Sequence, residues 1–248
     1  MCYFCTMSLL PWHSAKVVEV RPHNAHTRSF ILAAENTDVF DFTPGQFVTF
    51  DLPIAERPSQ RMRSYSIASA PQGNKQFELV ITHQPHGAGS GYFFDHCVPG
   101  HILKYRGPQG TFVLPEVIER PLVMICTGTG IAPFRSQILH LLKHNIPTPD
   151  IHLVFGTRTV ADALYATELE ALAKRYLHFH YYLTLSRPDV HWTGRRGYVH
   201  DIYTEICGNG SADMDFYLCG WRMMINDARA KLEALGYGKE RVHLEVYD

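Results

Sequence analysis

The chain has 248 residues, of which 46% are apolar and 19% are charged, as is typical of a globular protein of one or two domains. Lys and Arg number 23 and Asp and Glu 24, so no excess of positive charge attracts nucleic acid or an anionic membrane. No apolar run approaches the roughly 18 residues that span a bilayer. We therefore expect a cytoplasmic protein without a nucleic-acid or membrane partner.

Six cysteines are too few for a disulfide scaffold and indicate a reducing compartment. Residues 1–15 form an N-terminal extension that lacks the charged start and cleavage site of a signal peptide. Cys2 and Cys5 form a C-x-x-C pair there, but no second pair completes a zinc or iron–sulfur site. The pair is expected to have no function, and the chain is expected to hold no iron–sulfur cluster of its own.

Residues 16–119 contain short β-rich runs separated by turn signals such as Pro44-Gly45, Pro99-Gly100 and Gly107-Pro108. One short helix is expected over residues 91–97. Six short strands with this spacing predict a closed antiparallel barrel. The expected strands are residues 17–20, 28–32, 46–50, 64–68, 77–82 and 101–105.

Residues 120–248 change to alternating strands and helices. Residues 122–126 are continuously apolar, as expected of a strand buried on both faces. The alternation predicts a doubly wound parallel α/β sheet as a second domain. The other expected strands are residues 151–155, 178–185, 215–219 and 241–246, and the expected helices are residues 133–144, 161–176, 199–206 and 223–235.

A glycine-containing loop, residues 127–133 (TGTGIAP), follows the first strand of this second domain. Its glycines allow close approach of the backbone to a phosphate, and the next helix offers free N–H groups and a positive dipole end. Pro133 fits the first helical turn. The loop departs from the strict G-x-G-x-x-G pattern, but its place between strand and helix favours a dinucleotide site.

Two segments of the first domain could also bind a phosphate-bearing cofactor. Residues 63–67 (RSYSI) place a guanidinium, an aromatic ring and hydroxyls close together, with Arg63, Tyr65 and Ile67 on one strand face. An ordinary amphipathic strand would explain them as well. Residues 87–91 (GAGSG) precede the short helix and form a second candidate phosphate loop at a helix start.

Together these motifs resemble the ferredoxin–NADP reductase superfamily, whose members join a flavin-binding barrel to a nicotinamide-binding α/β domain. The resemblance covers the chain from about residue 16 to its end. In chain order the motifs are Pro44-Gly45-Gln46, Arg63-x-Tyr65-Ser66, Gly107-Pro108-x-Gly110-x-Phe112, Gly128-Thr129-Gly130-Ile131-Ala132-Pro133, Cys219-Gly220 and Glu245-Val246-Tyr247.

The resemblance implies FAD as the cofactor of the barrel. It assigns Arg63 to the FAD pyrophosphate, Tyr65 to the isoalloxazine and Ser66 to the flavin N5. The other FAD-binding residues it implies are Ser64, Ile81, His83, Gly89, Ser90, Gly91 and Tyr247. No metal site is expected, because the histidines near this region, His83, His86, His96 and His101, show no metal-ligand spacing.

On the nicotinamide side the resemblance implies contacts from Thr129, Gly130, Cys219 and Gly220. Cys219 read alone is an ordinary core thiol, but the family's matching cysteine lies beside the nicotinamide. The family likewise uses Glu245 for proton relay and Tyr247 for stacking on the flavin. Ser66, Cys219, Glu245 and Tyr247 are therefore the candidate catalytic residues. Asp248 departs from the plant-type pattern, which ends on the tyrosine.

The choice of nicotinamide coenzyme depends on the residues near the adenosine ribose. A site for NADH usually carries an acidic residue there, whereas a 2′-phosphate site carries arginine. Arg158, Ser186, Arg187 and Arg195 follow the second and third strands of the α/β domain and resemble the NADPH-selective branch. The sequence therefore predicts NADP(H), although the same arginines could be plain surface charges.

The implied function is hydride transfer from NADPH to FAD and then single-electron transfer to a separate carrier, ferredoxin or flavodoxin, by a monomeric enzyme. The reductase component of an oxygenase remains an alternative. A flavin electron-transfer module without nucleotide chemistry is a second alternative, and a siderophore-iron reductase a third. The near-zero net charge does not identify the acceptor.

Overall fold

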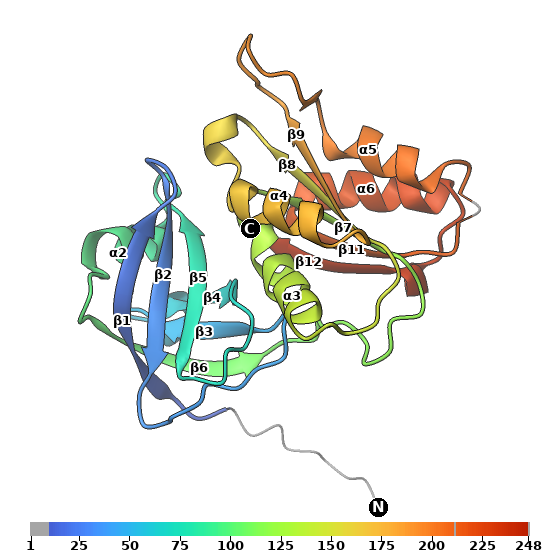
Figure 1. Cartoon of the computed structure of the whole chain (residues 1–248). Coiled ribbons are helices and arrows are strands. Elements are labelled where there is room, and N and C mark those ends of the chain that lie inside the picture. Colours follow the sequence, from blue (N-terminus) through green and yellow to red (C-terminus); the bar gives the residue numbers. More distant parts are fainter. Residues whose placement is uncertain (1–9, 211, 248) are drawn as a thin grey trace, which may run out of the picture.

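The computed structural model describes residues 10–210 and 212–247. Two lobes follow one another along the chain, each built around one six-stranded sheet (Figure 1). The first sheet is antiparallel, and the second is parallel with helices on both faces. This confirms the predicted fold class. The predicted domain limits of 1–15, 16–119 and 120–248 stay predictions; residues 110–121 connect the lobes.

The first lobe is a barrel with strand order β4-β3-β6-β1-β2-β5. It closes where Ile67 forms an isolated bridge with Leu79 and where Ala68 N–H donates to Glu78 O at 2.8 Å. Closure removes the exposed edges of an open sheet. Its elements are β1 (His13–Pro22), β2 (Thr27–Ala34), β3 (Phe47–Asp51), α1 (Pro58–Arg61), β4 (Met62–Ser66), β5 (Gln76–Thr82), α2 (Ala88–His96) and β6 (Ile102–Gln109).

Aromatic side chains fill the barrel. Phe93 of α2 packs edge-on against Phe30 and Phe50 at ring distances of 5.1 and 5.4 Å. Phe40 stacks on Phe77 at 4.4 Å. Because large rings bury much apolar area, this cluster anchors α2 against the barrel and fixes the position of its first turn.

The second lobe has strand order β10-β9-β8-β7-β11-β12, in which the chain starts at the centre and winds outward both ways. Such sheets bind ligands at the carboxyl ends of their strands, near the point where the order reverses, here between β7 and β11. The strands are β7 (Leu122–Thr127), β8 (Ile151–Thr157), β9 (Phe179–Leu185), β10 (Arg195–Arg196), β11 (Asp215–Trp221) and β12 (Val242–Tyr247); the helices are α3 (Ile131–Lys143), α4 (Ala166–Arg175), α5 (Val199–Cys207) and α6 (Arg222–Ala234), with 3-10 turns at Gly128–Gly130, Val160–Asp162 and Lys239–Arg241.

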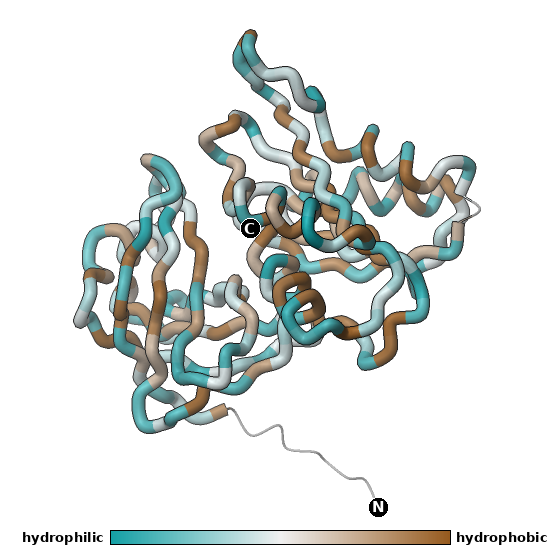
Figure 2. The backbone as a smooth tube through the Cα atoms, viewed as in Figure 1, coloured by the Kyte–Doolittle hydropathy of each residue, from teal (hydrophilic) through white to brown (hydrophobic). Residues whose placement is uncertain are grey.

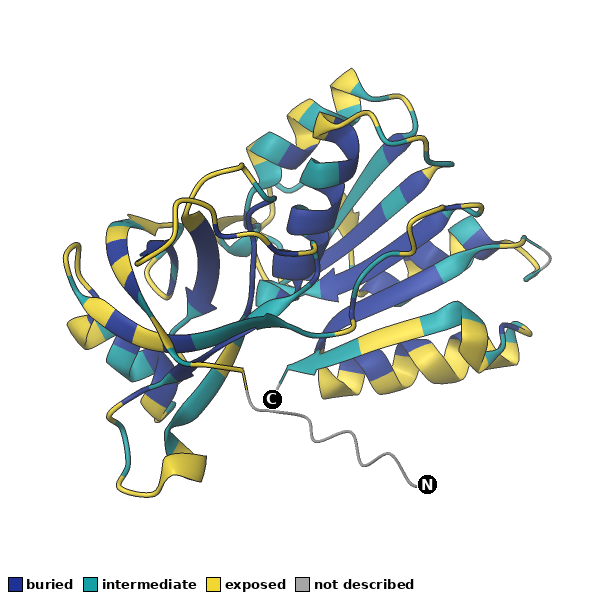
Figure 3. Ribbon diagram, turned by 90° about the horizontal axis from the view of Figure 1, so that it is seen from below, coloured by how far each residue is buried: buried dark blue, intermediate teal, exposed yellow. Residues whose placement is uncertain are grey.

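The helices cover opposite faces of the parallel sheet. Apolar residues of α3 and α4 pack with one face, and those of α5 and α6 pack with the other. The central strands are consequently buried on both sides, while α6 exposes its outer surface (Figure 3). The hydropathy of the chain follows this layering, with hydrophobic residues concentrated in the central strands and the inner helix faces (Figure 2).

Two predicted helices have different limits. The helix expected over 161–176 is a 3-10 turn followed by α4, because the chain reverses at Tyr165, whose φ is +58°. The helix expected over 91–97 begins earlier, at Ala88, so Gly89 and Gly91 lie in its first turn and not before it. The short elements α1 and β10 were not predicted; four and two residues are too few for a periodic pattern.

Candidate active site at the junction of the lobes

The start of helix α2 lies directly against strand β4. A Cβ placed on Gly89 would lie 2.7 Å from Cγ of Arg63 and 3.1 Å from the hydroxyl of Tyr65. Only glycine allows this approach. The predicted pyrophosphate residues from two separate segments are thus adjacent, with the aliphatic stem of Arg63 beside a helix N-terminus that favours anions. The Arg63 guanidinium donates to the main-chain oxygens of Gln60 (3.0 Å) and Met62 (2.7 Å). This arrangement fits the diphosphate of FAD.

The first turn of α2 presents backbone groups more than side chains. The Ser90 hydroxyl is buried, accepts from Gln84 N–H at 3.0 Å and donates to Gly87 O at 3.2 Å. Gly91 N–H already donates to Gly87 O. The N–H groups available to a phosphate are therefore those of residues 88–90. Because both hydrogen bonds of the Ser90 hydroxyl are to main-chain groups of this turn, we expect the side chain to stabilise the shape of the turn.

The other predicted FAD residues differ in how they are placed. Tyr65 packs on Phe93 at 5.1 Å and is only partly buried, which leaves ring surface for a flavin. The Ser64 side chain lies on the other side of β4, where it contacts the Thr49 hydroxyl at 2.9 Å. Ile81 is 3% exposed and packs in the barrel core, so its side chain faces away from the site. His83 lies against Phe94 near α2.

In the second lobe, the glycine loop after β7 contacts the end of β11 backbone to backbone. A Cβ on Gly130 would lie 2.4 Å from Cys219 O, and one on Gly220 would lie 2.6 Å from Thr127 Oγ1. Gly220 also has a φ of +134°. Thr129 lies in the 3-10 turn between β7 and α3. These contacts unite the two predicted nicotinamide motifs at the carboxyl ends of adjacent strands.

Side chains from both lobes meet at Glu245 of β12. Ser66, at the end of β4, donates its hydroxyl to Glu245 Oε1 at 2.8 Å. The Cys219 thiol donates to the same oxygen at 3.9 Å from the neighbouring strand β11, where the two residues are register partners. Strand pairing within the second lobe places Cys219 beside Glu245, and the docking of the first lobe brings Ser66 to the same carboxylate.

Burial determines the protonation states at this junction. It raises the pKa of Glu245, and the hydrogen bond from Ser66 opposes that effect. Burial also raises the pKa of Cys219 well above its ordinary value, and the Glu245 carboxylate acts in the same direction, so the residue is a thiol. The Tyr247 hydroxyl is buried beside them, close to Ser66, Cys219 and Glu245. The cluster of Ser66, Cys219, Glu245 and Tyr247 can thus both hold a proton and deliver one.

The predicted 2′-phosphate residues occupy the carboxyl ends of β8 and β9. Main-chain hydrogen bonds join Ser186 N–H to Thr157 O (2.9 Å) and Arg187 N–H to Arg158 O (2.8 Å). Arg158 and Arg187 are therefore neighbours, and both are exposed. Arg195 belongs to β10 and pairs with Glu205 at 2.7 Å, so part of its charge is already neutralised.

Sequence reasoning overlooked Trp221, a residue that is 56% exposed at the end of β11. Its indole nitrogen is the nearest atom, at 4.0 Å, to a Cβ placed on Gly128, so the ring lies next to the glycine loop. Its position directly after Cys219-Gly220 was the available signal. Cys2, Cys5 and Asp248 lie outside the described residues.

Two family matches cover most of the chain. Residues 14–114 match the family described as "Oxidoreductase FAD-binding domain", and residues 124–230 match "Oxidoreductase NAD-binding domain". "Ferredoxin--NADP reductase B" of Sorangium cellulosum is 35% identical over 240 residues, which are 94% of this chain and 97% of that protein. The chain belongs to the ferredoxin–NADP reductase family. It is an oxidoreductase with an FAD-binding and an NAD(P)-binding domain.

Other proteins similar to this chain differ in their named activities. The anthranilate 1,2-dioxygenase electron transfer component of Acinetobacter baylyi is 31% identical over 215 residues, which cover 87% of this chain but 61% of that protein. A cytochrome P450 reductase from Amycolatopsis superposes with a TM-score of 0.84 at 26% identity, over 96% of this chain and 70% of that one. A Neisseria gonorrhoeae ferredoxin NADP+ reductase with bound FAD and NADP has a TM-score of 0.78 at 21% identity, over 95% and 98% of the two chains, and shows the fold alone.

Within the described part of the chain, every helix is too short or too polar to cross a bilayer.

Proposed function

We propose that this protein is an NADPH-dependent flavoprotein reductase that passes electrons to a separate carrier such as ferredoxin or flavodoxin. The observation that carries the proposal is the meeting of Ser66 of the FAD-binding lobe and Cys219 of the nucleotide-binding lobe on one carboxylate, Glu245. A family member that carries out hydride transfer between two bound cofactors needs its polar groups at the contact of the two domains.

The site's own residues bind, orient and supply protons. Arg63 and the N–H groups at the start of α2 would hold the FAD diphosphate, and the loop at Thr127–Gly130 would hold that of the nucleotide. Bound FAD supplies the redox chemistry, accepting a hydride and releasing electrons one at a time. Glu245, with its raised pKa, retains a proton near neutral pH more readily than an ordinary glutamate, and its Oε1 accepts a hydrogen bond from the Ser66 hydroxyl.

The preference for NADPH rests on Arg158 and Arg187. Both guanidiniums are exposed at the carboxyl ends of neighbouring strands, and the main-chain bond between the two residues fixes their spacing. Arginine binds phosphate in a geometrically specific way. We therefore place the 2′-phosphate of NADPH between them, with Ser186 alongside.

A second candidate function is the reductase component of an oxygenase. It is favoured by the relatives named as dioxygenase or monooxygenase subunits, of which the chain spans 61–64% of the length. Both functions use the same site and differ in the acceptor alone.

The test is steady-state turnover of the FAD-loaded protein with ferredoxin, flavodoxin or an oxygenase component as acceptor. Arg187→Ala should raise KM for NADPH about tenfold or more, since a hydrogen bond to a charged group contributes roughly 1.5–3 kcal/mol, and should leave KM for NADH unchanged. Arg175→Ala, at the exposed end of α4, is the control. Equal KM values for NADPH in the parent and Arg187→Ala would contradict the assignment of the 2′-phosphate site.

A further inference from the structure

Strands β8 and β9 bring two histidines together at the amino ends of the parallel sheet. His152 and His180 are register partners on these adjacent strands, and their rings stack at 4.8 Å with an interplanar angle of 17°. Asp150 directly precedes β8, and its Oδ1 lies 3.6 Å from His180 Nε2. One nitrogen or oxygen from each of the three side chains lies within 4.8 Å of the others.

All three side chains can be reached from solvent. The side chains of Asp150 and His180 are 55% and 37% exposed, and His152 is partly buried. His152 is on the same strand as Val154, at a spacing of two residues, and Val154 packs with α5 and α6. The histidine pair therefore lies on that face of the sheet, near its open rim. A dissolved ion can enter without any movement of the core.

The surroundings of His152 prepare it for a ligand role. Its Nδ1 lies 3.4 Å from the Tyr182 hydroxyl, whose ring is stacked on the imidazole at 6.0 Å. Such an outer partner orients a metal-binding imidazole and leaves its other nitrogen available.

We propose that Asp150, His152 and His180 form a binding site for a divalent transition-metal ion of the Zn²⁺ class. Two imidazoles and one carboxylate suit Zn²⁺ and similar borderline ions, whereas Ca²⁺ and Mg²⁺ prefer sites made of oxygen ligands. Bonds of about 2.1 Å in a tetrahedral site separate the donor atoms by roughly 3.4 Å. Rotations of the three side chains would bring the donor atoms from within 4.8 Å of one another to this separation, and water would complete the coordination.

This metal site is separate from the proposed redox site. The glycine loop and the arginines lie at the carboxyl ends of the strands, and β8 has seven residues. At about 3.3 Å per residue, the two sites are roughly 20 Å apart. A bound ion would join the starts of β8 and β9 and stabilise the folded protein, because it binds that state selectively.

The test is isothermal titration of the FAD-loaded full chain with Zn²⁺, repeated on His152→Gln and His180→Gln. We expect one site per chain in the parent, weakened at least about tenfold in each variant. Asp150→Asn, at an exposed position, should also weaken binding and is the variant least able to disturb folding. Zn²⁺ should raise the thermal midpoint of the parent, and a chelator should reverse the increase.

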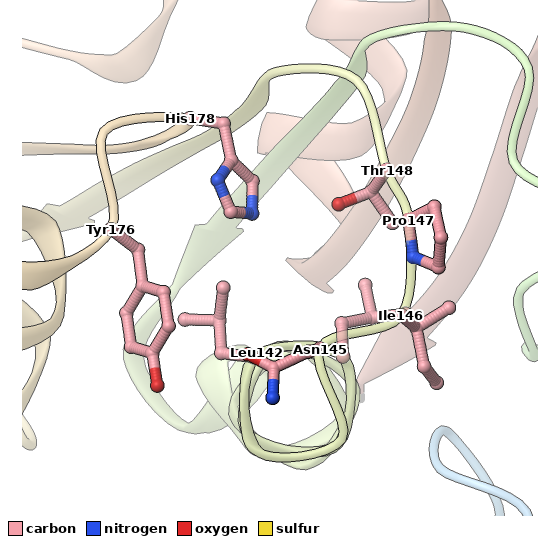
Figure 4. A pocket seen from close by; sticks show the side chains of 8 residues that line it. Leu142, Asn145, Ile146, Pro147, Thr148, Tyr176 and His178 are labelled. Carbon is pink, nitrogen blue, oxygen red and sulfur yellow. The ribbon is translucent and has the colours of Figure 1, made fainter.

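His178→Gln is the matched control. His178 is two residues from His180 but points into a cavity of about 200 Å³ on the α3 face, together with Tyr176 and Thr148 (Figure 4). Zn²⁺ affinity should be unchanged in this variant and in Cys2→Ser/Cys5→Ser. The proposal is overturned if the parent binds no Zn²⁺, if binding survives in His152→Gln and His180→Gln, or if it is lost in Cys2→Ser/Cys5→Ser.

Discussion

Arg135 of α3 lies 3.2 Å from Glu78 of β5, so the two lobes share a largely buried ion pair. The same guanidinium donates to Ala68 O at 2.8 Å and to Glu168 at 2.6 Å, and it lies 4.1 Å from the Tyr165 ring. These contacts fix α3 against the barrel. Because Ser66 and Glu245 also meet across this interface, the ion pair positions the candidate active site from a distance.

Replacing Arg135 with Met should destabilise the protein. Glu78 would keep its bonds from Ser29 and Tyr165 but lose its cation, and an unpaired buried charge costs about 3–5 kcal/mol. Urea unfolding of the apoprotein measures the loss. The double variant Arg135→Met/Glu78→Gln should recover most of it. Arg120→Met, at an exposed pair, is the control, and an unchanged midpoint in Arg135→Met would refute the role assigned to the pair.

Gly89→Ala should weaken FAD binding. The added methyl would lie 2.7 Å from Arg63 Cγ, so the Arg63 side chain must shift away from α2 and move its guanidinium with it. Losing one charge-assisted contact raises the Kd for FAD about tenfold or more. Fluorescence titration of the apoprotein with FAD gives this value. Gly91→Ala is the control for helix strain, because no atom lies within 4 Å of its added methyl; its apoprotein should be as stable as the parent. Parent-like FAD affinity in Gly89→Ala would count against the site.

Cys219→Ser should slow flavin reduction about tenfold or more while leaving FAD bound, because the thiol contacts Glu245 and lies outside the FAD-binding lobe. Rapid-mixing measurements of flavin bleaching by NADPH report the first effect, and the flavin content of purified protein reports the second. Cys126→Ser is the matched control, since Cys126 is the fully buried register partner of Cys219 on β7. Equal slowing in both variants would indicate a packing effect.

Glu245→Gln should change stability in a pH-dependent way. Burial raises the folded pKa above the ordinary value of 4.5, so ionisation of Glu245 costs stability as the pH rises from about 4.5 through the folded pKa. The glutamine cannot ionise. The unfolding free energy of the variant should therefore match the parent below about pH 4, exceed it increasingly as the pH rises to the folded pKa of Glu245, and keep a constant advantage above that pKa. Chemical unfolding at a series of pH values checks this, and an advantage that shrinks with rising pH would contradict it. Turnover should fall in the same variant.

The fold class was predictable because its signals are local. The continuous apolar run at 122–126 indicated a strand buried on both faces, and the glycine loop after it marked the ligand-binding end of the sheet. The limits of a helix were less predictable where an unusual backbone conformation sets the residue at which the helix begins. The reversal at Tyr165 requires a positive φ that a bulky residue rarely adopts, so no sequence rule places a helix start there.

Relationships between distant residues could not be read from the sequence. The Arg135–Glu78 pair depends on how the lobes dock, and the pairing of His152 with His180 depends on strand register. Neither has a characteristic spacing. The FAD-binding roles of Ser90 and Ile81 stay predictions, and the sequence did not show that the Ser90 hydroxyl bonds within its own turn or that the Ile81 side chain packs in the barrel core.

The most direct test of the proposed function is anaerobic reduction of the FAD-loaded protein by NADPH and by NADH in parallel. Rapid-mixing absorbance measurements record the loss of the flavin band with each coenzyme. NADPH should bleach the flavin band with an apparent affinity about tenfold or more above that of NADH, because only NADPH carries a phosphate for Arg158 and Arg187. Equal or better reduction by NADH would contradict the coenzyme assignment. A protein that shows no flavin spectrum after reconstitution with FAD would contradict the account as a whole.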